Sequence, residues 1–375
     1  MSDVAEEEQA ERPETASGRA AVRTFGDERS RLQRIALWSG VTVLLLGLVS
    51  LSRVSPIQVL VIGIQAGAVY SLVALGVALV YKATRVLNFA QGELGTVPAF
   101  AAFAFLVGGD IAADVQGQPS AGRLFVASVV AILVGVVLAV LVNVLVVRPL
   151  AEATPVVALV ATVGVTLLLV AAEIIVFEAR ARRFPRYVEG SPCLGPETAE
   201  GASFGLCPLT VGAIRIPWHT IIVAAVLAAA AALLAAFFQT RRGTALLATA
   251  QEPFAAELQG VSVKGMATLA WAMAGAFGAV AGLLGGGNFN QITPGFMTAT
   301  FLIPGFVGAI LGGITSMPGA VLGGLLIGIA VTLANEIALQ YDLTTVLPGP
   351  PQIAILLVLL LVLLLRPRGL LGKEA

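Results

Sequence analysis

The chain is a succession of long apolar segments, broken by glycine and joined mostly by short polar loops, and this pattern restricts it to a membrane. Of its 375 residues, 58% are hydrophobic and 12% are charged, and the mean hydropathy of +0.94 far exceeds that of soluble domains. A helix of about 20 apolar residues crosses about 30 Å of hydrocarbon. The sequence therefore predicts an all-α, polytopic membrane protein.

Hydropathy predicts about ten transmembrane helices, of which the first, eighth and last are short for a complete crossing. Short spans must use their polar flanks or lie partly inside the bundle. The ten predicted spans are Ile35 to Leu51, Ile57 to Tyr81, Val86 to Val107, Leu124 to Val147, Pro155 to Phe177, Trp218 to Phe238, Met266 to Leu284, Phe296 to Leu311, Ala320 to Ala338 and Pro351 to Leu365.

The distribution of basic residues predicts that both termini are cytoplasmic. An even number of spans places both ends on one side, and with that side inside the cell 15 of the 22 basic residues face the cytoplasm. The formal net charge is zero, and no basic stripe interleaved with aromatic residues points to nucleic acid as a partner. We therefore expect a multi-pass protein of a bacterial cytoplasmic membrane, with the lipid bilayer as its environment.

Two polar regions flank or interrupt this membrane domain, which we place at residues 35–372. Residues 1–34 are acidic and almost free of large apolar side chains, so we expect a disordered cytoplasmic tail. Residues 178–217 form a long external loop that contains Cys193 and Cys207. A disulfide between them would stabilise the loop by about 3 kcal/mol; two unpaired thiols are the alternative.

Pairs of glycines recur four residues apart, as in Gly63 with Gly67 and Gly278 with Gly282. Such spacing lets helix backbones approach closely in lipid, so we interpret these pairs as packing sites. Two glycine-rich runs, residues 285–290 and 312–319, differ because polar residues or proline accompany them. We expect the helices to break there, and breaks at this depth are tolerated where they face protein or a water-filled path.

Five polar residues within or beside the spans are candidates for a translocation path: Asn88, Gln91, Glu93, Asn288 and Asn290. A carboxylate at the centre of a membrane helix costs about 2.5–3.5 kcal/mol, so Glu93 should face a cavity or a partner. The alternative is that Glu93 lies near the inner interface and pairs with Lys82 or Arg85. Glu173 and Glu336 fall near the outer ends of their spans and are expected at the interface, as is His219.

The chain contains no phosphate-binding loop of the GxxxxGK[ST] type and no cluster of metal ligands. Any ATP and magnesium would therefore be bound by another subunit, and no cofactor is expected in this chain. The basic loop at residues 239–265 could dock such a subunit. It combines Arg241 and Arg242 with a helix-forming stretch, a break at Pro253 and a second short helix closed by Gly260. A solvated connector is the alternative interpretation.

Three ordered segments carry a family resemblance: LGVALVYKATRVLNFAQGELG at residues 75–95, the stretch from Arg241 to Leu284, and GAILGGITSMPGAVLGGLLIGIA at residues 308–330. Together they resemble the permease subunits of ABC importers for branched-chain amino acids, over most of the chain. In that family a loop helix with two alanines and a glycine docks on the ATPase. The residues at those positions here are Ala255, Ala256 and Gly260, whereas Phe254 stands where the broader importer pattern has glutamate.

The resemblance implies a type II-like importer permease, and it implies the partners. These are two ABC ATPase subunits that bind ATP and magnesium, a second permease chain that is a paralogue, and an external solute-binding protein. It does not distinguish branched-chain amino acids from urea or short amides. The competing hypotheses are a secondary transporter coupled to H⁺ or Na⁺ through Glu93 or Glu173, and a membrane scaffold without transport.

Overall fold

The computed structural model describes residues 56–151, 153–188, 209–211, 214–343, 349–365 and 369–371. The acidic tail and the first predicted span, Ile35 to Leu51, lie outside the described residues, as do Cys193 and Cys207. The predictions for these segments therefore remain predictions.

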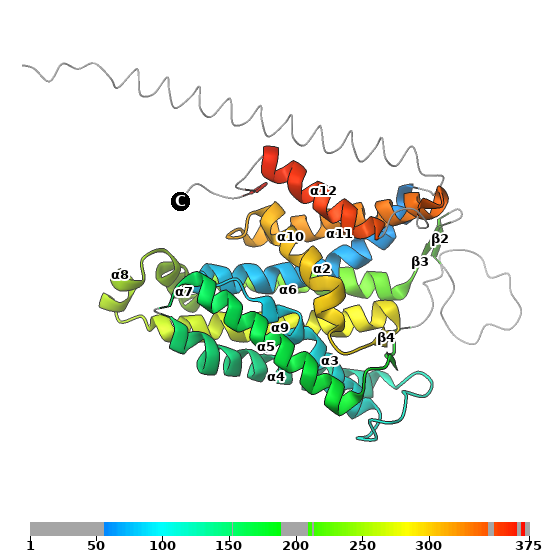
Figure 1. Cartoon of the computed structure of the whole chain (residues 1–375), viewed down its shortest axis with the longest axis horizontal. Coiled ribbons are helices and arrows are strands. Elements are labelled where there is room, and N and C mark those ends of the chain that lie inside the picture. Colours follow the sequence, from blue (N-terminus) through cyan, green and yellow to red (C-terminus); the bar gives the residue numbers. More distant parts are fainter. Residues whose placement is uncertain are drawn as a thin grey trace, which may run out of the picture. The chain divides into compact units, whose positions relative to one another are not determined.

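Helices make up most of the described chain, which confirms the all-α class (Figure 1). The long helices and the two helices of the basic loop are α2 (Pro56–Thr84), α3 (Glu93–Leu106), α4 (Ala121–Val142), α5 (Pro155–Phe177), α6 (Trp218–Phe238), α7 (Arg241–Gln251), α8 (Pro253–Leu258), α9 (Val263–Phe289), α10 (Ile303–Gly312), α11 (Met317–Gln340) and α12 (Pro350–Leu365). Short helical turns extend or precede some of them: η1 (Phe89–Gln91), η2 (Asn143–Val147), η3 (Arg148–Leu150) and η4 (Thr298–Leu302).

Seven of these helical segments are long and apolar enough to cross a membrane, and two shorter apolar helices accompany them. The shorter ones are the η4–α10 segment at residues 298–312 and α12, which correspond to the eighth and tenth predicted spans. All nine predicted spans within the described part of the chain coincide with helices. The protein is therefore a multi-pass membrane protein, and the first of the ten predicted spans lies outside the described residues.

Helix α2 lies against α11, and small residues let the two backbones approach closely. A Cβ atom added to Gly63 would lie 2.8 Å from the Cα of Ile329, and one added to Gly67 would lie 2.8 Å from the Cα of Leu325. Gly328 of α11 faces Gly67 in return. These contacts confirm the interpretation of the glycine pairs as packing sites.

Helix α9 packs in the same way against α3 and α4. Gly278 packs against the carbonyl of Leu94 in α3, and Gly282 packs against the carbonyl of Gly95 in the same helix. Gly275 packs against the backbone of Gly135 in α4. The indole of Trp271 is fully buried in the adjoining core. Helix α9 is thus fixed from two sides, and it forms the frame on which α3 is held.

We predict that Gly282→Leu strongly destabilises the bundle. A Cβ at this position would overlap the backbone of Gly95, and backbone cannot move aside as a flexible side chain can. We expect a loss of at least about 1–3 kcal/mol, visible as a lower unfolding temperature in detergent. Gly164→Leu is the matched control, because Gly164 lies within α5 with open space around it. Equal unfolding temperatures for the two variants would contradict the packing.

Both predicted runs contain a helix end, but in the first run the helix ends at the last residues and not at the glycines. Helix α9 continues through Gly285, Gly286 and Gly287 and ends at Asn290, which adopts the left-handed conformation with φ 56°. Each glycine in this run makes room for a neighbouring side chain, including Phe301, Phe184 and His219. The prediction of a break at residues 312–319 is confirmed, because α10 ends at Gly312, Gly313 has φ 98°, and α11 begins at Met317.

Two pairs of very short strands lie at the end of the bundle opposite α7 and α8 (Figure 1). Strand β1 (Arg182–Arg183) pairs antiparallel with β4 (Gln291–Ile292), and β2 (Leu209–Val211) pairs with β3 (Ile214–Ile216). We call this end the strand end, and we call the opposite one the hairpin end. The strand end belongs to the predicted external side, and the hairpin end to the predicted cytoplasmic side.

Candidate functional site

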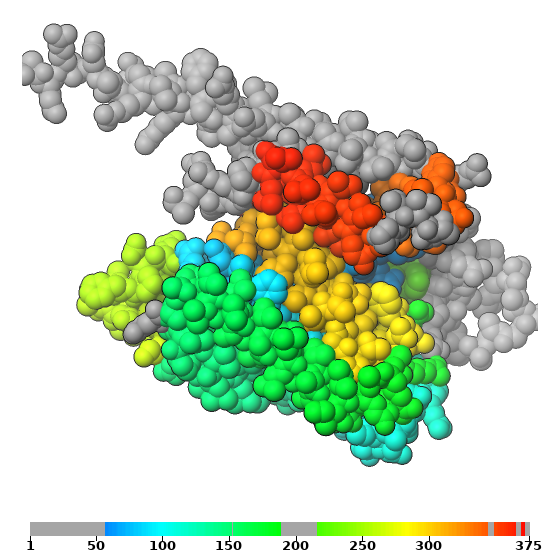
Figure 2. Space-filling model, viewed as in Figure 1, coloured from blue at the N-terminus to red at the C-terminus, as the bar shows by residue number. Residues whose placement is uncertain are grey.

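The basic loop folds into two short helices, α7 and α8, which form a hairpin that projects from the bundle (Figure 2). Helix α7 begins where the Thr240 hydroxyl accepts a hydrogen bond from the N–H of Gly243, at 3.2 Å. Helix α8 begins at Pro253 and closes at Gly260, whose φ of 79° favours glycine. The predicted pair of helices, with its break and its closing glycine, is confirmed.

The tip of this hairpin exposes an apolar pair. Phe254 and Leu258 lie four residues apart, on one face of α8, and are 73% and 72% exposed. Ala255 is also exposed, whereas Ala256, in the middle of α8, is buried. Of the predicted docking residues, Ala256 therefore stabilises the hairpin while Ala255 lies at its surface. The sequence reasoning missed Leu258 and treated Phe254 only as a departure from the pattern; their spacing after Pro253 was the available signal.

The hairpin is anchored to the bundle through α7. The side chain of Leu246 is fully buried, and the Arg85 guanidinium donates a hydrogen bond to the carbonyl of Ala250, at 3.3 Å. Arg85 follows the last residue of α2 and has φ 57°, so it marks the turn from α2 toward α3. A displacement of α7 would therefore act on the connection between α2 and α3.

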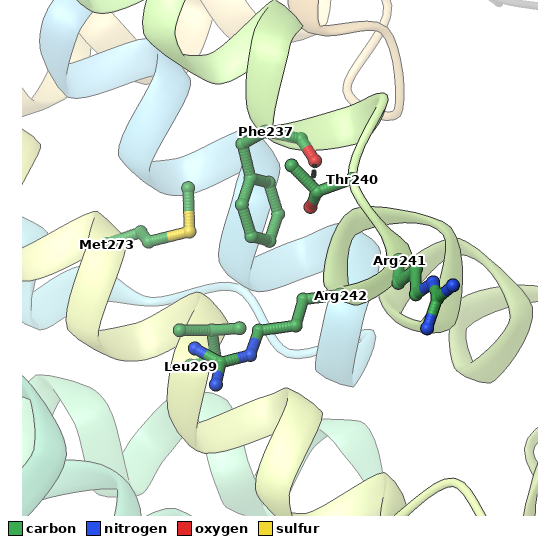
Figure 3. Close-up of a pocket in the computed structure, with 6 residues that line it drawn as sticks. All are labelled: Phe237, Thr240, Arg241, Arg242, Leu269 and Met273. Carbon is green, nitrogen blue, oxygen red and sulfur yellow. Dashed lines mark hydrogen bonds between the residues drawn. The ribbon is translucent and has the colours of Figure 1, made fainter.

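The two predicted docking arginines lie at the start of α7, beside a cavity of about 610 Å³ between α6, α7 and α9 (Figure 3). Arg242 extends toward Leu269 on α9, whereas Arg241 points away from the bundle (Figure 3). Both arginines are exposed. The structure thus places both guanidinium groups on the surface of the hairpin end, near the base of the hairpin.

The segment from Asn88 to Glu93 is buried and starts α3 inside the bundle. Asn88, Gln91 and Glu93 have no exposed surface. Asn88 accepts a hydrogen bond from the N–H of Ala90, at 3.0 Å, and the Gln91 amide donates to the carbonyl of Ala274 on α9, at 3.0 Å. Asn88 thus satisfies a backbone group where the chain passes from α2 to α3, as an irregular segment within a membrane requires, and Gln91 fixes this segment to α9.

Glu93 lies against a second acidic side chain, Glu173 of α5, and against the hydroxyl groups of Thr96 and Thr298. Glu173 is 4% exposed, and one of its oxygens accepts the N–H of Gly295, at 2.8 Å. The other three carboxyl oxygens of the pair are buried and have no hydrogen-bond donor among the described residues. The prediction that Glu173 lies at the interface is therefore wrong, because the turn after β4 packs over it.

The alternative interpretation of Glu93, as a partner of Lys82 or Arg85, is also wrong. The Lys82 ammonium donates to the carbonyl of Thr315, at 3.2 Å, and Arg85 contacts Ala250. Glu93 is instead enclosed by α3, α5 and the η4 turn. A buried pair of carboxyl groups from two helices is the kind of feature that marks functional sites in membrane proteins.

The other two path candidates lie at the strand end, separate from this pair. The Asn288 side-chain oxygen accepts from Gln65 of α2, at 3.0 Å, and lies 2.7 Å from Nε2 of His219. Thr220 donates to Gln65, at 2.6 Å, which closes a network across α2, α6 and α9. Asn290 is exposed and ends α9.

His219 is therefore 1% exposed and hydrogen-bonded, rather than at the interface as predicted. The structure groups Asn88, Gln91 and Glu93 in one place and Asn288 in another, and the five candidates do not share one site. Sequence reasoning missed Gln65 and His219, because hydropathy carries no information on which helices meet.

Comparison with known proteins gives one consistent result. Residues 59–365 match the model of the family described as branched-chain amino acid transport system / permease component. The chain is 28% identical over 324 residues to the high-affinity branched-chain amino acid transport system permease protein BraD of Pseudomonas aeruginosa, covering 84% of this chain and 96% of the relative.

It is also 28% identical over 316 residues to the high-affinity permease protein LivH of Escherichia coli K12, with 83% and 94% of the two chains covered. A probable LivH of Methanocaldococcus jannaschii is 26% identical over 306 residues, with 81% and 88% covered. No solved structure matches the chain. The family match runs from within α2 to the end of α12 and includes the hairpin and the buried acidic pair. The chain belongs to the family of branched-chain amino acid transport system permease components.

Proposed function

We propose that this chain is the membrane-spanning subunit of an ATP-driven ABC importer and forms the path for branched-chain amino acids or similar small solutes. The observation that carries the proposal is the α7–α8 hairpin. It projects from the hairpin end, exposes Phe254 and Leu258, and is anchored to the α2–α3 connection through Arg85. An exposed apolar pair on a short helix fits a groove on a partner protein.

The partners follow from the family and from the same geometry. Two ATPase subunits would bind ATP and magnesium, and each would receive one hairpin from a pair of permease chains, the second being a paralogue. ATP binds the closed ATPase pair better than the open one, and this differential affinity is what shifts a coupled permease between its two states. An external solute-binding protein would deliver the solute and set the selectivity.

A tagged chain, solubilised gently from its native membrane, tests the proposal through co-purification. We expect an ATPase of the ABC type to purify with it, together with a second permease chain. Uptake should stop when the gene for that ATPase is deleted. Recovery of the chain without any nucleotide-binding protein, in a membrane that still imports the solute, would contradict the proposal.

A secondary transporter coupled to H⁺ or Na⁺ is the second candidate function, and the buried pair of Glu93 and Glu173 favours it. The two candidates differ in their energy source. If uptake persists without the ATPase and collapses with an uncoupler, the ion-driven function replaces the first one.

The identity of the solute is a separate question, since urea or short amides would suit the same conduit. A binding screen on the matching external protein distinguishes these solutes.

A further inference from the structure

A second cavity of about 500 Å³ lies at the hairpin end, beneath the hairpin itself. Five parts of the chain line it: the end of α2, the η2 and η3 turns, the start of α5, the end of α7 with the start of α8, and the start of α9. None of the five path candidates lines this cavity. It is therefore a feature separate from the buried acidic pair and from the network at the strand end.

The cavity combines apolar walls with a basic lining. Its walls include Val86, Val147 and Pro155, and its basic side chains are those of Lys82, Arg85, Arg148 and Lys264. No acidic side chain lines it among the described residues. Arg148 and Lys264 are exposed and form no ion pair or side-chain hydrogen bond within the described part of the chain.

This lining selects the charge of a ligand. An amino acid carries an ammonium group as well as a carboxylate, and the ammonium would enter a site whose described charges are all positive. A ligand with net negative charge and an apolar body would interact with both the basic side chains and the apolar walls of the cavity. Basic pockets between helices on the cytoplasmic side of a membrane bind the phosphate head groups of lipids by this principle.

We infer that this cavity binds a phosphate-bearing anion, with Arg148 and Lys264 as its main ligands, and that its apolar walls favour the head-group end of an anionic phospholipid. The inference uses the predicted cytoplasmic side of the hairpin but does not require that ATP drives transport. Because Thr249, Gln251 and Pro253 form one wall, a bound head group would brace the hairpin against α9 and η3. Anionic lipid would then stabilise the hairpin that we propose as the dock.

Native mass spectrometry on the purified full chain tests this inference directly. The protein is reconstituted with phosphatidylglycerol and phosphatidylcholine, and the retained lipids are counted without any ATPase present. We expect selective retention of phosphatidylglycerol, weakened about thirtyfold in the double variant Arg148→Gln/Lys264→Gln. The control, Arg180→Gln/Arg241→Gln, removes two positive charges outside the cavity and should retain phosphatidylglycerol like the unchanged chain.

A second arm uses inorganic phosphate alone, titrated against the chain in a zwitterionic detergent. Phosphate binding that weakens in the same double variant and displaces phosphatidylglycerol assigns the site to a soluble phosphate compound. Phosphatidylglycerol retention that resists phosphate assigns it to the lipid. Equal binding of both probes by the unchanged chain and the double variant overturns the inference, whereas the proposed import function fails only if the ATPase experiments fail.

Discussion

Replacing both Phe254 and Leu258 with aspartate is expected to abolish association with the ATPase and, with it, uptake. The two side chains are largely exposed in the isolated chain and contribute no core contacts, so the bundle should remain folded. Burying each such side chain in a partner contributes about 1.5–3 kcal/mol. Losing both weakens docking at least about a hundredfold. Co-purification of the ATPase and uptake of solute in cells measure the two effects.

The matched control for this pair is Phe254→Leu with Leu258→Met, which keeps the surface apolar and similar in size. It should retain the ATPase. The thermal unfolding of the isolated permease should be equal for the control and the aspartate variant. A full complex and normal uptake with both aspartates in place would show that the hairpin is a solvated connector instead.

Replacing Glu93 with glutamine is expected to reduce uptake at least about tenfold while the protein remains folded, because a carboxyl group retained inside a membrane bundle marks a functional site. Glutamine has nearly the same shape, so packing beside Thr96 and Thr298 is kept, but an amide can neither carry the charge of a carboxylate nor give up a carboxyl proton. Glu173→Gln should have a similar effect. Because the two carboxyl groups touch, the double variant should lose less than the product of the single losses.

Glu336→Gln is the control for this pair, since that residue lies only partly buried in α11. It should transport normally. Uptake at the unchanged rate in both Glu93→Gln and Glu173→Gln would show that the buried pair serves only the packing of α3 against α5. Losses that multiply in the double variant would show that the two residues act separately.

The hairpin and the acidic pair are connected through the backbone in a short series of contacts. Arg85 joins Ala250 of α7 to the end of α2, and three residues later Asn88 begins the buried segment that leads into α3. Gln91 then fixes this segment to α9. Under the proposed docking of an ATPase, a movement of the hairpin would act on the segment that carries Glu93.

Hydropathy was sufficient to predict the helices, because each span contains many apolar residues and all of them indicate a membrane helix. The hairpin was predictable for a different reason: Pro253 can open a helix but not continue one, and Gly260 closes it with a positive φ. The long-range contacts were not predictable. Glu173 lies near the end of its helix in sequence, and only the packing of the turn at Gly295 encloses it.

The glycine run at residues 285–287 is a second case in which long-range packing decides the structure and the local sequence does not predict it. In isolation three glycines favour a break, but in the bundle each leaves space that a neighbouring side chain fills, so the helix continues. The strand pair β1–β4 joins residues more than a hundred positions apart, and no local pattern marks such pairing. Propensity was overridden by tertiary packing in both cases.

An α7–α8 hairpin that docks an ATPase must face the compartment that holds ATP. The most direct test labels the single substitution Ala255→Cys, in a chain whose Cys193 and Cys207 are replaced by serine, with a membrane-impermeant thiol reagent. We predict labelling in inside-out vesicles and none in intact cells. Labelling of Ala255→Cys from outside intact cells would place the hairpin on the external side and exclude it as the ATPase dock.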